Sequence, residues 1–145
     1  MSLTIKKYLK WSYLVILVTF GVVMTVLLEP VTYNDISSDP QYSKLINTEY
    51  KTTDELYIYG IRENGDAAKI LDYYDITEVN FSGPEVSSKD VLKKGTILKI
   101  KRVEKARNFF IKEIRYAVDI DPKYENNQKT IYVKSDKLNT YTILN

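Results

Sequence analysis

Paired acidic residues are the side chains of this 145-residue chain with the clearest potential for chemistry. Two neighbouring carboxyl groups can act as general acid and base, or can bind a metal ion through oxygen. The candidate pairs are Asp54 with Glu55, Asp72 with Asp75, and Asp119 with Asp121. Each has a plain structural explanation, because acids are common at element boundaries and on the solvent side of strands. Glu125, Asn126 and Asn127 lack the closely spaced acids and the glycine of a calcium loop. The sequence therefore predicts no catalytic residue, no cofactor and no metal ion.

The composition excludes most other catalytic sites, because the chain has no Cys and no His. Without them there are no disulfides, no thiolate or imidazole metal ligands, no cysteine nucleophile and no serine–histidine relay. Attachment of a lipid to cysteine is excluded as well. We expect a protein that is not an enzyme and has no small-molecule substrate.

The most hydrophobic segment runs from Trp11 to Leu28 and has eighteen residues without a charge. As a helix it would be about 27 Å long, close to the roughly 30 Å core of a bilayer. A cleaved secretory signal is the alternative. However, the run exceeds the roughly 7–15 apolar residues of such signals, and no pair of small residues follows it at the spacing of a cleavage site. The sequence predicts an uncleaved signal anchor, a transmembrane helix over 11–28. Its anchor residues are Trp11, Tyr13, Leu14, Ile16, Leu17, Phe20, Gly21 and Leu28.

The charges on the two sides of this segment predict its orientation. Basic residues remain on the cytoplasmic side of a membrane, and the lysines before the segment contrast with Glu29, Asp35 and Asp39 after it. The expected topology is single-pass in the inner (cytoplasmic) membrane. Residues 1–10 would lie in the cytoplasm and the C-terminal domain in the periplasm or outside the cell. The residues that determine this topology are Lys6, Lys7 and Lys10.

Residues 29–53 are rich in polar residues and predict a juxtamembrane stalk. Within it, Asp39 is a capping-type residue, Pro40 suits the first helical position, and Tyr42, Leu45 and Ile46 have the spacing of one helix face. We expect one short helix here, and a disordered tether is the alternative.

Residues 54–145 predict a small, mainly β domain. Leu56–Ile61 is a strand pattern, and Asn64-Gly65 after it is a hairpin signal. Residues 67–74 fit helical spacing, but the hairpin favours a returning strand. In 109–120, apolar residues alternate with polar ones, which is typical of a strand with one face on a core. Further strands are expected at 78–81, 96–103, 130–134 and 141–144.

Two segments resemble a known family. Ser82-Gly83-Pro84 followed by Leu92-Lys93-Lys94-Gly95-Thr96-Ile97 is similar to the first half of a bacterial SH3-like domain. Ile131 to Leu138 is similar to the closing strand and one-turn helix of that family. The resemblance covers 54–138 at most and implies a small β-barrel that binds cell wall or peptide. The tryptophan usual after the Lys-Gly-Thr turn is missing, and the sequence there is Asn108-Phe109-Phe110.

Charge is distributed unevenly along the chain. Residues 30–92 have a net charge of −7 and residues 93–145 of +7. A basic hairpin could bind anionic headgroups, a glycan or an acidic partner. The alternative is a solvated ribbon whose charges offset the acidic half of the same domain. The candidate basic face consists of Lys93, Lys94, Lys99, Lys101, Arg102, Lys105 and Arg107.

These features favour a non-catalytic accessory or scaffolding subunit of an inner-membrane complex, whose β domain binds an integral membrane protein. The lipid bilayer would be contacted through the anchor, and a domain outside the cytoplasm would not bind nucleic acid. A membrane-tethered inhibitor or immunity protein is the alternative, and a cell-wall-binding module is the second alternative.

Overall fold

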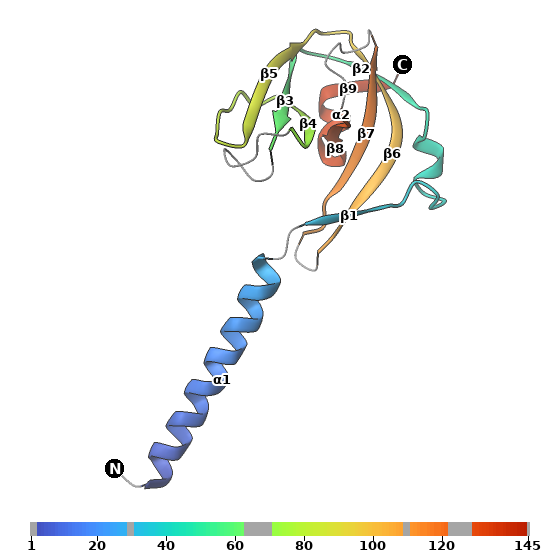
Figure 1. The fold of residues 1–145 in the computed structure, drawn as a ribbon. Coiled ribbons are helices and arrows are strands. Elements are labelled where there is room, and N and C mark those ends of the chain that lie inside the picture. Colours follow the sequence, from blue (N-terminus) through green and yellow to red (C-terminus); the bar gives the residue numbers. More distant parts are fainter. Residues whose placement is uncertain (1–2, 29–30, 63–70, 109–110, 122–128, 145) are drawn as a thin grey trace. The chain divides into compact units, whose positions relative to one another are not determined.

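The computed structural model describes residues 3–28, 31–62, 71–108, 111–121 and 129–144. By contacts the chain divides into two units, Met1–Val31 and Thr32–Asn145. The first unit contains the helix α1 (Leu3–Leu28), whose described side chains run from Trp11 to Thr25. The second unit contains the β sheet (Figure 1).

The described residues include no helix that is both long and apolar enough to cross a membrane. This finding contradicts the predicted transmembrane anchor at 11–28 and the fold class that contained it. It also contradicts the single-pass topology and the inner-membrane localisation. The side chains of Lys6, Lys7, Lys10 and Leu28 lie outside the described residues.

The described residues of the second unit form one sheet of nine strands, joined in the order β5-β3-β4-β8-β7-β6-β2-β9, with β1 also paired to β6. The pairs are antiparallel except for β4 with β8. The strands are β1 (Thr32–Asp35), β2 (Glu49–Thr52), β3 (Leu56–Ile61), β4 (Tyr73–Thr77), β5 (Val86–Leu92), β6 (Ile97–Arg107), β7 (Ile114–Asp121), β8 (Ile131–Lys134) and β9 (Thr142–Leu144).

The segment expected to be a stalk is part of this sheet. Strand β1 pairs with the second half of β6, and β2 pairs with its first half. Between them the expected helix is reduced to a 3-10 turn, η1 (Ser43–Leu45). Its apolar residues Tyr42, Leu45 and Ile46 pack against the core, so the apolar pattern was correct but the helix was not.

The strand expected at 78–81 is absent from the described structure, and the strand lies earlier, at β4. Residues 86–92, where the sequence predicted no strand, form β5 at an edge of the sheet. An edge strand exposed over most of its length does not need alternating apolar residues, which explains the error. Asn64-Gly65 lies outside the described residues, but β3 and β4 are antiparallel neighbours, as a hairpin requires.

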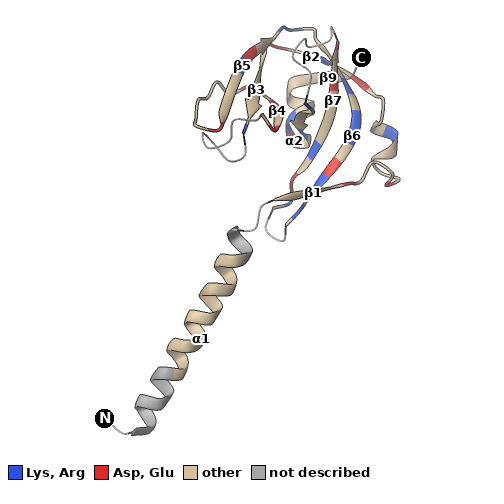
Figure 2. Cartoon of the chain, in the orientation of Figure 1, with Lys and Arg blue, Asp and Glu red and all other residues tan. Residues whose placement is uncertain are grey.

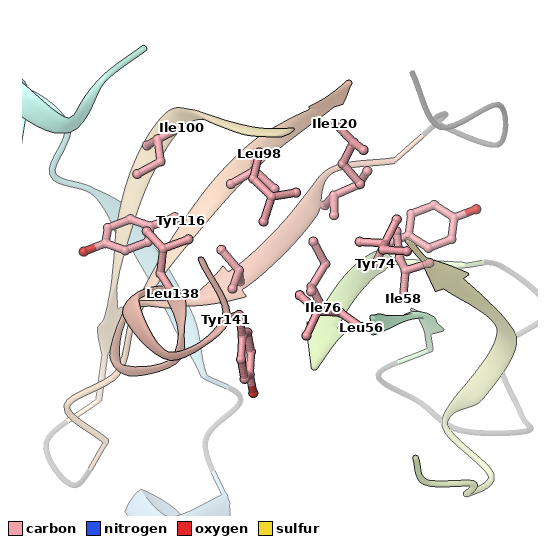
Figure 3. Packing of buried hydrophobic residues seen from close by; sticks show 14 of the residues in the cluster. Leu56, Ile58, Tyr74, Ile76, Leu98, Ile100, Tyr116, Ile120, Leu138 and Tyr141 are labelled. Carbon is pink, nitrogen blue, oxygen red and sulfur yellow. The ribbon is translucent and has the colours of Figure 1, made fainter. Parts of the chain in front are cut away.

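Apolar side chains from one face of the curved sheet form the core (Figure 3). Leu98 and Ile100 of β6, Tyr116 and Ile120 of β7, and Ile58 of β3 point into it. Helix α2 (Ser135–Tyr141) contributes Leu138 and Tyr141 and contacts β7, β8 and β9. Because alternate residues of a strand point to opposite faces, the residues between these core positions lie on the other side of the sheet. We call that side the outer face.

Candidate functional site

The outer face of β1, β6, β7 and β8 contains a buried carboxylate that binds two arginines. Glu104 is only 7% exposed. Its Oε1 accepts from Arg102 Nε at 2.7 Å and from the Tyr132 hydroxyl at 3.2 Å. Its Oε2 accepts from Arg115 Nε at 2.9 Å. Both oxygens are therefore occupied, and a single negative charge is shared by two guanidinium groups.

Arg115 is held by aromatic rings as well as by Glu104. Its guanidinium carbon lies 3.4 Å from the ring centroid of Tyr33 and 3.8 Å from that of Tyr132. The Tyr73 ring packs edge-on against Tyr132, with 5.6 Å between centroids. A guanidinium that stacks on aromatic faces and binds a carboxylate is fixed in orientation. Arg115 is consequently a rigid part of this face.

A cavity of about 220 Å³ adjoins this arginine. We call it the tyrosine cavity, and its lining residues are Tyr33, Tyr73, Asp75, Glu113, Arg115, Tyr132 and Lys134. Glu113 is bound from both sides: Oε1 accepts from the Tyr33 hydroxyl at 3.0 Å and Oε2 from Lys134 Nζ at 2.9 Å. The hydrogen bond to Glu113 raises the pKa of Lys134. Burial, together with the bond to Glu113, raises that of Tyr33.

Asp75 is the remaining acid of the tyrosine cavity. Burial raises the pKa of its carboxyl to about 6, because charge is costly to keep away from water. Lys134 opposes this shift and Glu113 adds to it. Among the described residues Asp75 forms no ion pair, in contrast to Glu104 and Glu113.

A second cavity, of about 450 Å³, lies over the small side chain of Ala117. We call it the basic cavity. Its lining includes three cationic side chains and one carboxylate, and the complete lining is Lys101, Arg102, Ala117, Val118, Asp119, Lys129, Thr130 and Ile131. A bulge in the pairing of β6 with β7 falls between Ile100 and Arg102. Since an extra residue changes which way the following side chains point, the bulge allows Lys101 and Arg102 to line the same cavity.

The structure divides the predicted basic face. Figure 2 shows basic and acidic residues interspersed along β6 and β7. Lys99 pairs with Glu49 at 3.2 Å, Lys101 with Asp119 at 3.4 Å and Arg102 with Glu104 at 2.6 Å. Lys93 and Lys94 lie before the start of β6, whereas Lys105 and Arg107 lie at its other end. The eleven residues of this strand extend over about 35 Å. Of this set, Lys101 and Arg102 line the basic cavity.

The acid pairs predicted from the sequence do not form catalytic sites in the structure, because most of these residues are exposed at or near strand ends. Asp54 and Glu55 are exposed before β3, and Asp72 is exposed before β4. Asp119 and Asp121 are exposed on β7, where Asp119 binds Lys101. Asp75 instead shares the tyrosine cavity with Glu113, which is 38 positions away in sequence. Among the described residues no cluster of three or more acidic side chains could hold a metal ion.

Sequence reasoning missed Glu104, Arg115 and Lys129 as members of a site. Glu104 lies among the residues of the predicted basic face and Arg115 lies on the next strand, but neither was assigned a role. Their pairing follows from the register of β6 with β7, in which Glu104 is opposite Arg115. The signal in the sequence was an acid within a run of basic residues on a strand. Lys129 has no comparable signal.

Comparison with protein families, with curated proteins and with solved structures finds no match for this chain. The resemblance to bacterial SH3-like domains therefore stays a prediction.

Proposed function

We propose that residues 32–145 form a non-catalytic binding domain, and that the protein is an accessory or scaffolding subunit whose basic cavity binds an acidic segment of a partner protein. The observation that carries this proposal is the convergence of Lys101, Arg102 and Lys129 on one cavity that contains a single carboxylate, Asp119.

The charges in the basic cavity suit exchange with a partner. Lys101 and Asp119 are 45% and 60% exposed, so their pair is worth at most about 1 kcal/mol in water. An incoming carboxylate can replace Asp119 at little cost. Arg102 is 42% exposed although it binds Glu104, and it keeps further N–H donors for a second acceptor.

A peptide segment fits this cavity better than a compact ligand. The cavity is wide and polar, and strand residues form its floor, so it offers little apolar surface to a small molecule. Bidentate bonds from arginine to carboxylate, flanked by lysines, are a common way of recognising acidic segments. The attraction accelerates association and weakens with salt.

The chain offers a matched pair of variants for the test. Lys99 and Lys101 lie two positions apart on β6, and each forms an exposed ion pair. Lys99→Glu and Lys101→Glu make the same charge change, but only Lys101 lines the basic cavity. Each tagged full-length variant would be titrated with a labelled hexaglutamate peptide. Each would also be used to co-purify a constant-ratio partner, identified by mass spectrometry.

We expect Lys101→Glu to weaken both interactions at least about tenfold, because it replaces an attraction to the acidic segment by a repulsion between like charges. Lys99→Glu should leave them within about twofold. Equal losses in the two variants would show attraction by net charge alone, and no loss in either would exclude the basic cavity.

A further inference from the structure

Among the described residues, the hydrogen bonds of the tyrosine cavity use only part of the donors on its two cations. Both oxygens of Glu113 are taken, by Tyr33 and Lys134, and both oxygens of Glu104 are taken by Arg102, Tyr132 and Arg115. Lys134 has three N–H donors and Arg115 has five. The bonds to Glu113 and Glu104 use only part of that number. An acceptor that enters the cavity would meet unused donors on both cations.

The net charge around the cavity also favours an anionic ligand. Arg102, Arg115 and Lys134 are balanced by Glu104, Glu113 and Asp75 only while Asp75 is ionised. When Asp75 carries a proton, the group has a net charge of +1 and Asp75 becomes a further donor. A small anion would then be neutralised and bound by donors alone.

From this geometry we infer that the tyrosine cavity is a binding site for a single carboxylate group, which enters together with a proton on Asp75. The carboxylate would accept hydrogen bonds from Lys134 and Arg115 and from the protonated Asp75. It belongs either to a small free acid or to an acidic side chain of a partner. The inference does not depend on the basic cavity, which has a different lining.

Asp75 is suited to this exchange of a proton. Its pKa of about 6 means that a modest change in surroundings converts it between the two forms. The titratable and charged groups around it come from every neighbouring element: Tyr73 on β4, Tyr59 opposite it on β3, Tyr132 and Lys134 on β8, Arg115 on β7, Glu113 before β7, and Tyr33 on β1.

The test is a titration of the full-length protein with sodium formate, at about pH 5 and about pH 8, between which Asp75 changes its charge. Formate is ionised at both values. Binding would be followed by the NMR signals of the Arg115 Nε–H and of the backbone amides of β4 and β8. We expect affinity to fall at least about tenfold from the lower to the higher pH, as the competent fraction of Asp75 falls.

Three variants locate the effect. Asp75→Asn keeps a neutral donor at all pH values, so formate should bind equally well at both. Lys134→Gln should lose binding, whereas Lys137→Gln, on α2 and outside the cavity, should not. Circular dichroism melting curves would show that all three variants are folded.

A second arm uses N-acetylglutamate amide in place of formate, to distinguish the two sources of the carboxylate. Tighter binding of the glutamate derivative would assign the site to an acidic side chain, and tighter binding of formate to a small free acid. Absence of shifts at Arg115 with both probes, or a pH dependence that survives Asp75→Asn, would overturn the inference.

Discussion

The two faces of the sheet are buried by different means. On the inner face, Leu98, Ile100 and Val133 are almost completely buried among other apolar side chains. On the outer face, Glu104 and Tyr132 are nearly as well buried, but their neighbours are guanidinium groups and hydroxyls. The inner face is stabilised by removal of apolar surface from water, and the outer face by hydrogen bonds that must all be made together.

This difference means that the inner face tolerates small changes of shape, whereas the outer face tolerates no missing partner. A buried charge network often gains little stability over an apolar one. The charges on the outer face therefore fit a site that binds ligands better than a second core.

Glu104→Ala should have the largest effect, a loss of about 3–5 kcal/mol, because it leaves Arg115 buried without its carboxylate. Urea denaturation followed by circular dichroism measures the loss. Asp119→Ala removes the acid of an exposed ion pair and is the control, with an expected change below about 1 kcal/mol. Similar effects of the two substitutions would mean that the Glu104 network is not tightly coupled.

Leu98→Ala should cost about 3 kcal/mol, from lost burial and the cavity left in the core. The same urea titration applies. A loss below about 1 kcal/mol would mean that Leu98 does not lie in a closely packed core.

Asp75→Asn should stabilise the domain by about 3 kcal/mol at pH 8 and by little below pH 4. The pKa of Asp75 is about 6 in the folded protein and 3.8 as the ordinary value, so the folded state holds the proton more tightly. Stability contributed by this group therefore falls as pH rises from about 4 to about 6. Thermal melts across this range should show that fall in the natural protein and its absence in the variant. A parallel fall in both would assign the pH dependence to another group.

Lys137→Ala should have the smallest effect, within about 0.5 kcal/mol, because its pair with Glu78 is 3.7 Å long and exposed. It checks that a single lost ion pair outside both cavities does not change stability. A loss above about 1 kcal/mol would indicate that surface charges, rather than the Glu104 network, support the fold.

The elements that sequence reasoning located best are those with a strong local pattern. The strand at Leu56–Ile61 is confirmed residue for residue, and the alternation around Tyr116 and Val118 matches β7. Strands β1 and β2 were missed because they are short and polar, and each is held by pairing to β6 rather than by its own residues. The helix predicted to cross a membrane was judged from hydropathy alone, and the described structure contradicts it.

What the sequence determined by itself is the chemistry that is available: no thiol or imidazole, many tyrosines, and a basic C-terminal half. It also determined which strand residues face the core, because alternation is a local property. Only the tertiary structure decided which charges meet. Glu104 faces Arg115 through the register of β6 with β7, and Asp75 faces Lys134 and Glu113 through the parallel pairing of β4 with β8. Register depends on contacts between distant residues, so neither cavity could be derived from the order of residues in the chain.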